Sequence, residues 1–137
     1  MIPGPIEFEP SVLRAMGEVT TSHVAPNFIE TFSNCLGFMK EIWKAPNGQP
    51  FILSGSGTLA MDVAIANLIE KGDNALVIST GYFGERFKDI LNCYGANVTF
   101  MKSSLGSCVS LLEIEAELKR KDYKLVTMTH VDTSTGV

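Results

Sequence analysis

The sequence predicts an α/β fold with three layers, in which a mainly parallel sheet has helices on both faces. Short apolar runs, typical of buried strands, alternate with stretches whose apolar residues recur every three or four positions. Each such stretch is long enough to form a helix that connects one strand to a parallel neighbour. Because the strands of a parallel sheet are buried on both faces, the alternation indicates helices on either side.

The first half of the chain contains two predicted helices and one predicted strand. From Asn27 to Lys44 the apolar residues lie on one helical face, and Pro46-Asn47-Gly48 ends this helix. Phe51 to Leu53 is predicted to be a short buried strand. Leu59 to Glu70 is predicted to be a helix, with Gly72 as its left-handed stop.

The second half of the chain repeats the alternation. Ala75 to Ile78, Val98 to Met101 and Leu125 to Met128 are predicted to be strands. Two helices are predicted between them, from Phe83 to Tyr94 and from Ser110 to Lys121. The second of these helices begins with a serine followed three residues later by a glutamate, which is the capping-box pattern.

Composition excludes several classes of protein. A chain of 137 residues with 45% hydrophobic residues can build one globular domain, and its net charge of −4 without a basic cluster argues against nucleic-acid binding. We expect neither a membrane span nor a secretion signal, and therefore an intracellular protein. Cys35, Cys93 and Cys108 are widely spaced, so we expect reduced thiols packed as small hydrophobic residues, and no metal site.

The segment Ser54-Gly55-Ser56-Gly57-Thr58 lies between a predicted strand and a predicted helix, where parallel sheets bind ligands. Its glycines let the backbone approach a ligand closely, while hydroxyls and helix-start N–H groups can donate to a phosphate. The segment matches neither the Walker loop nor the dinucleotide-binding fingerprint. A phosphate cradle and an ordinary solvated turn are equally compatible with these five residues.

The segment Ser79 to Gly84 follows the second predicted strand and places Tyr82 and Phe83 between two glycines. An aromatic side chain at this position can stack on a flat heterocycle. Core packing at a helix start is the alternative, and it is the commoner role of a single aromatic residue.

The segment Thr129 to Gly136 follows the last predicted strand and is rich in side chains that form hydrogen bonds. His130 is compatible with a catalytic base, although a structural histidine is the commoner role. Asp132 is more typical of a cap or turn former than of a general acid. A capped turn is therefore the alternative to a binding segment here.

Taken together and in this order, these segments resemble the class V aminotransferases of the pyridoxal-phosphate (PLP) fold type I superfamily, most closely the alanine–glyoxylate (serine–pyruvate) members. The resemblance covers essentially the whole chain, from Pro3-Gly4-Pro5 to Val137. It implies an aspartate-aminotransferase-like large domain, of which residues 51–137 are the first part. It also implies that residues 1–50 form an N-terminal segment that contacts the partner in a homodimer.

The resemblance also implies a role for individual residues. Ser56, Gly57 and Thr58 match the loop that holds the cofactor phosphate. Phe83 matches the residue that stacks on the pyridine ring, where the best-known members carry tryptophan. Thr133 matches a hydroxyl that bonds near the cofactor's ring oxygen, a position where serine is common.

The substrate side of the implied site is less complete. Gly4 matches a segment that lies beside the substrate carboxylate. The family's cofactor-binding lysine, the acid that keeps the pyridine nitrogen protonated and the substrate-binding arginine match no residue here; Lys102 fits no family motif. We therefore expect no catalytic residue in this segment, which looks like the N-terminal part of a larger enzyme.

The implied reaction moves an amino group from alanine, or serine, to glyoxylate; with alanine the products are glycine and pyruvate. Amino acids and 2-oxo acids are then the small-molecule substrates. Phosphoserine aminotransferases and cysteine desulfurases are alternatives within the family, although desulfurases usually carry histidine where Phe83 stands. A non-catalytic α/β module that binds a phosphate or a nucleotide is the alternative outside it.

Overall fold

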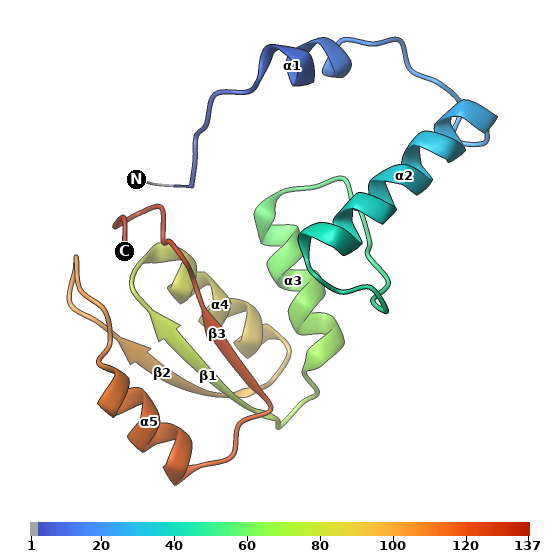
Figure 1. Cartoon of the computed structure of the whole chain (residues 1–137). Helices are drawn as coiled ribbons and strands as arrows, with labels where there is room; N and C mark the ends of the chain where they lie inside the picture. The colour runs from blue at the N-terminus through green and yellow to red at the C-terminus, as the bar shows by residue number, and fades with distance from the viewer. Residues whose placement is uncertain (1–2) are drawn as a thin grey trace. The chain divides into compact units, whose positions relative to one another are not determined.

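A computed structural model describes residues 3–137, which divide into two compact units. One unit combines Gly55–Val137 with residues 3–6, and the other is Glu7–Ser54. Figure 1 shows the larger unit as a sheet with helices packed around it. All the sheet strands, and the segments that follow them, belong to this larger unit.

The sheet contains three parallel strands: β1 (Asn74–Ser79), β2 (Asn97–Lys102) and β3 (Leu125–Met128), in the order β2-β1-β3. The three strands predicted between residues 75 and 128 and their parallel pairing are thus confirmed. β1 lies in the centre, and its five residues after Asn74 are all buried. A continuous apolar run suits this place because both of its faces are covered.

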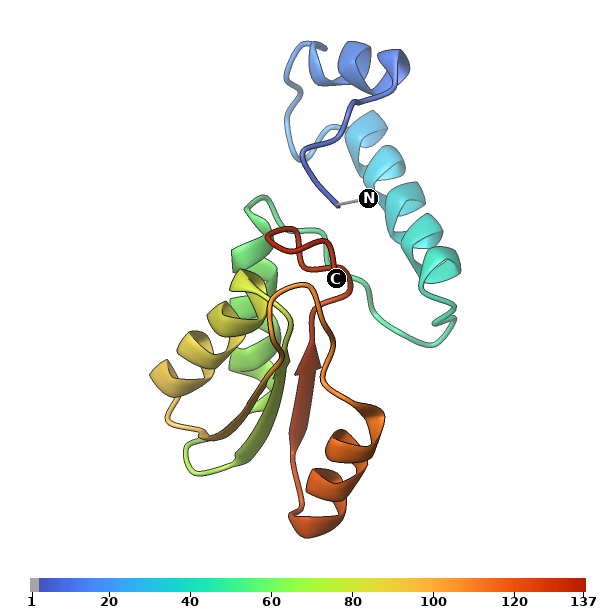
Figure 2. The same cartoon turned by 90° about the vertical axis from the view of Figure 1, so that its left-hand side faces the viewer.

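Three helices pack around the sheet: α3 (Gly57–Leu68), α4 (Tyr82–Cys93) and α5 (Leu111–Arg120). Figure 2 shows α3 and α4 along one face and α5 beside the other, which confirms the three-layer α/β arrangement. α5 begins with the predicted capping box, in which Ser110 and Glu113 exchange side-chain and backbone hydrogen bonds.

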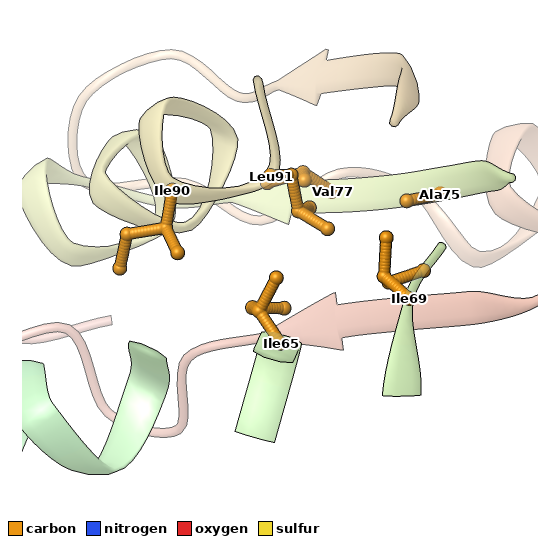
Figure 3. Packing of buried hydrophobic residues seen from close by; sticks show 6 residues of the cluster. All are labelled: Ile65, Ile69, Ala75, Val77, Ile90 and Leu91. Atoms are coloured by element: carbon orange, nitrogen blue, oxygen red, sulfur yellow. The ribbon is translucent and has the colours of Figure 1, made fainter. Parts of the chain in front are cut away.

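The main hydrophobic core lies between the sheet and the helices α3 and α4. Six buried residues form it (Figure 3): Ile65, Ile69, Ala75, Val77, Ile90 and Leu91. Ala75 and Val77 alternate along β1, as the strand period requires, while Ile65 on α3 and Ile69 just after it are four residues apart. Ile90 and Leu91 are neighbours on α4. Gly72 has the predicted left-handed conformation, with a φ of +93°, but it does not end the helix, because α3 ends at Leu68, four residues earlier.

The smaller unit contains α1 (Pro10–Met16) and α2 (Pro26–Ile42). The sequence predicted α2 but not the short helix α1. Neither helix contains a buried residue. On the apolar face of α2, the rings of Phe28 and Phe32 stack on each other with their centroids 5.9 Å apart.

Two predictions were wrong. Phe51 to Leu53 is not a strand; these side chains are exposed, because no neighbouring strand within residues 3–137 pairs with this run. The cysteines are free, but only Cys35 is partly buried, whereas Cys93 and Cys108 are exposed at the end of α4 and in the loop before α5.

Within residues 3–137, no helix has the length and apolar character needed to cross a membrane.

Candidate functional site

The candidate site lies at the edge of the sheet where β1 and β3 end. The loop after β1 leads into the first turn of α4, and the loop after β3 folds back against that turn. Parallel sheets bind ligands at this edge, because each strand hands over to its connecting segment there. Two of the three segments singled out from the sequence, Ser79 to Gly84 and Thr129 to Gly136, are in direct contact.

Asp132 joins these two segments. One carboxylate oxygen, Oδ2, accepts hydrogen bonds from the backbone N–H groups of Phe83 (2.9 Å) and Gly84 (3.2 Å). The other, Oδ1, accepts from the N–H (3.0 Å) and the hydroxyl (2.7 Å) of Ser134. The Ser134 hydroxyl in turn accepts from the N–H of Tyr82 at 2.9 Å. Asp132 and Ser134 together satisfy three N–H groups at the start of α4 that have no partner within the helix.

The Asp132 side chain is completely buried, with 0% of its surface exposed. Burial alone would raise its pKa, but the hydrogen bonds from Ser134, Gly84 and Phe83 favour the charged form and hold the pKa below its usual value. The carboxylate is therefore ionised at neutral pH. The positive end of the α4 dipole adds to this stabilisation.

Two glycines allow the segments to approach this closely. A Cβ on Gly81 would lie 2.4 Å from Ser134 Oγ and 2.7 Å from Asp132 Oδ1. A Cβ on Gly84 would lie 2.6 Å from the hydroxyl oxygen of Ser79. Ser79 is itself fully buried and donates its hydroxyl to the Gly81 carbonyl at 3.0 Å. The turn between β1 and α4 thus has no room for side chains at either position.

A cavity of about 250 Å³ lies beside this turn. Gly57 lines it from the start of α3, Phe83 from the start of α4, and Thr129 and Thr133 from the loop after β3. Pro3 lines it as well. The structure therefore brings together three of the residues singled out from the sequence, Gly57, Phe83 and Thr133.

The other three sequence-predicted residues lie around this cavity rather than in its lining. Ser56 and Thr58 line a neighbouring cavity of about 380 Å³ between α3 and α4. Ser56 is the N-cap of α3, and its hydroxyl accepts from the N–H of Leu59 at 3.4 Å. Gly4 follows Pro3 in the chain and is partly buried.

The lining has the chemistry that a phosphorylated heterocycle requires. Among residues 3–137, no atom other than those of its chain neighbours and its own helix backbone lies within 4 Å of where a Cβ on Gly57 would be, so the start of α3 is open to a ligand. The hydroxyl oxygen of Thr129, which lines the cavity, is buried without a hydrogen-bond partner among the described residues. An aromatic ring, an open helix N-terminus and an unpaired hydroxyl fit PLP, whose ring stacks and whose phosphate accepts hydrogen bonds.

The two other side chains considered for chemistry lie elsewhere. His130 is exposed and does not line the cavity. Lys102 pairs with Glu85 at 2.5 Å on the surface, as expected of a solvated strand end. The sequence did not reveal the contact between Asp132 and the start of α4. A helix cap is predicted from the residues directly before the helix, whereas Asp132 lies 49 residues after Phe83.

Comparison with known proteins shows the family of this chain. Residues 11–137 match the model of the family described as aminotransferase class-V. The chain belongs to the class-V aminotransferase family. The resemblance stated from the sequence motifs is thereby confirmed.

Individual class-V relatives match along the whole chain. Alanine–glyoxylate aminotransferase 1 of Saccharomyces cerevisiae is 40% identical over 144 residues, covering 100% of this chain and 37% of the yeast protein. Alanine–glyoxylate aminotransferase from Nostoc sp. has 35% identity and a TM-score of 0.88, covering 98% of this chain and 36% of that one. Ureidoglycine–glyoxylate aminotransferase from Bacillus subtilis has 30% identity and a TM-score of 0.90, covering 99% of this chain and 35% of that one. This chain therefore spans little more than a third of the relatives it matches.

Proposed function

We propose that the complete protein is a PLP-dependent aminotransferase that moves an amino group from alanine to glyoxylate, yielding pyruvate and glycine. The observation that supports this proposal most is the cavity shared by Gly57, Phe83 and Thr133, three matched positions brought together from three elements. Glyoxylate appears in the names of the yeast, Nostoc and Bacillus relatives, which favours it as the amino acceptor.

The residues of this chain would bind and orient the cofactor. The N-terminus of α3, with Ser56, Gly57 and Thr58, would hold the phosphate through N–H groups and hydroxyls. Phe83 would stack on the ring, and the Thr133 hydroxyl would bond beside the ring oxygen. When bound, PLP supplies an electron sink for the bonds at the substrate's α-carbon.

The remaining functional groups are expected outside residues 1–137. They are a lysine that binds the cofactor, an acid at the pyridine nitrogen and an arginine for the substrate carboxylate. Gly4 would lie beside that carboxylate. We further propose a homodimer in which the smaller unit, Glu7–Ser54, contacts the partner, since neither of its helices contains a buried residue.

The cofactor is tested by the absorption spectrum of the full-length protein. We expect a visible band after purification with PLP, and we expect alanine to abolish this band and glyoxylate to restore it. A full-length protein that remains colourless and takes up no PLP would contradict the proposal.

The amino donor needs a separate test, because the Bacillus relative is described with ureidoglycine instead of alanine. Full-length protein with glyoxylate as acceptor should form glycine from alanine with a higher kcat/KM than from serine or ureidoglycine. A preference for another donor would keep the reaction class and overturn the choice of alanine.

A further inference from the structure

We propose that Asp132 is a positioning residue of the cofactor site, which fixes the turn that carries Phe83 relative to the loop that carries Thr133. The connection itself follows from the contacts of Asp132. That the site holds PLP rests on the proposed function. Asp132 does not line the cavity; it acts through its neighbours.

The connection uses one carboxylate oxygen for each segment. Oδ2 holds the N–H groups of Phe83 and Gly84 on α4, and Oδ1 holds Ser134 in its own loop. The two segments are 49 residues apart in sequence, so no local turn fixes their distance. Asp132 accepts a hydrogen bond from the backbone N–H of Phe83, and it immediately precedes Thr133 in the chain.

The negative charge is needed because both oxygens must accept. Four neutral groups donate to a fully buried carboxylate, and their hydrogen bonds favour the ionised form. An asparagine has one oxygen and one NH₂ group. On one side of the connection, its NH₂ group would therefore lie opposite N–H or O–H donors, and no hydrogen bond could form there. Replacing Asp132 by asparagine should therefore release one segment from the other while almost preserving the volume of the side chain.

Release would alter the cavity because Phe83 and Thr133 line it from the two connected segments. The fit is close at this point, since Gly81 has no space for a Cβ against Asp132 and Ser134. A shift of the first turn of α4 would change the ring's position over the cofactor. The effect on a bound cofactor is then one of orientation as well as of affinity.

The test compares Asp132→Asn and Ser134→Ala in the full-length protein, with Asp122→Asn as the matched control. Asp122 is exposed, and its only described hydrogen bond uses the backbone carbonyl, which the control retains. We expect Asp132→Asn to weaken PLP binding by about ten- to a hundredfold, and Ser134→Ala to weaken it less. We also expect both variants to change the circular dichroism of the visible cofactor band per PLP bound.

The dichroism per bound PLP separates positioning from general destabilisation. A purely structural role would lower the thermal midpoint of the protein without PLP and leave this ratio unchanged, and an unchanged ratio in both variants would overturn the proposal. If Asp132→Asn does not fold, Ser134→Ala decides by the same ratio.

Amide hydrogen exchange tests the connection without any cofactor. Peptides that span residues 82–84 should exchange faster in Asp132→Asn and Ser134→Ala than in Asp122→Asn. Equal exchange in all three would overturn the connection. A wild-type protein that binds no PLP would overturn the proposed function instead, and the exchange data would then decide the role of Asp132 alone.

Discussion

Gly84 is the residue at which the turn between β1 and α4 leaves no space for a side chain against the end of β1. A Cβ there would lie 2.7 Å from the Cα of Ser79 and 2.8 Å from its Cβ, and neither atom can move without shifting a buried strand. We expect Gly84→Ala to lower the free energy of unfolding by about 1–3 kcal/mol. Urea unfolding of the full-length protein measures this. Gly37→Ala is the control, because among the described residues no atom other than those of its chain neighbours and its own helix backbone lies within 4 Å of its added Cβ; equal losses would contradict the prediction.

Substitutions at Thr58 and Ser56 distinguish the loss of cofactor binding from the loss of helix capping. Thr58→Ala should weaken PLP binding about ten- to a hundredfold by removing a hydrogen bond to a charged phosphate. The helix should keep its stability, because Thr58 is not the cap. Ser56→Ala should weaken binding and also cost about 1 kcal/mol of stability, since its hydroxyl caps α3. PLP titration and urea unfolding of both variants distinguish these effects; an unchanged dissociation constant for Thr58→Ala would place the phosphate elsewhere.

Among the elements, α5 is joined to the sheet by a small polar network. The Tyr123 hydroxyl, in the loop after α5, bonds to Glu117 on the helix and to the Thr99 hydroxyl on β2 at 2.8 Å. Arg120 donates to the same glutamate at 2.6 and 2.9 Å. The helix itself contains no buried residue, so this network accounts for part of its attachment.

This network makes the stability of the protein depend on pH below 5. Hydrogen bonds from Arg120 and Tyr123 lower the pKa of Glu117 from 4.5 to about 2. A pKa lowered in the folded state stabilises the fold above the unfolded value, and this contribution is lost as the pH falls from about 4.5 towards 2. We expect Glu117→Gln to lower the thermal midpoint at pH 6, with a difference from wild type that shrinks by pH 3. Glu115→Gln is the control on the same helix; a gap that stays constant with pH would contradict the prediction.

The sequence predicted β1, α3 and α4 well, and these three elements share one core. It also predicted α2 and α5, which contain no buried residue, from the helical spacing of their apolar residues. Phe51 to Leu53 misled the prediction because three apolar residues have no measurable period, and the structure leaves them exposed. α1 has only seven residues and none is buried, so its sequence carries little amphipathic signal.

The candidate site was predictable in its parts but not in its assembly. Each segment carried a local signal of its own, namely glycines and hydroxyls around Gly57, an aromatic pair at Phe83 and a polar turn at Thr133. Their meeting at one cavity depends on the strand order β2-β1-β3, which places the ends of β1 and β3 side by side. A strand order is a long-range property, and no short sequence pattern specifies it.

At the scale of the whole molecule, large apolar side chains are exposed on both units. Among them are Phe51, Met128 and Leu111, with 73%, 64% and 82% of their surface exposed. β2 and β3 form the two edges of the described sheet, and each has a strand partner on one side only. Exposed apolar surface and unpaired strand edges both promote association with other chains.

We therefore expect residues 1–137 expressed alone to associate or precipitate, whereas the full-length protein should be a soluble homodimer. The fragment should also show no transamination, because no residue in it matches the lysine that binds the cofactor or the acid at the pyridine nitrogen. Light scattering and alanine–glyoxylate assays on both proteins at equal concentration measure these properties. The exposed apolar residues predict association, and the missing lysine predicts inactivity, so the two results are independent. A fragment that stays monomeric, unfolds cooperatively and converts alanine would overturn both the assignment of the smaller unit to the dimer contact and the expected location of the catalytic groups.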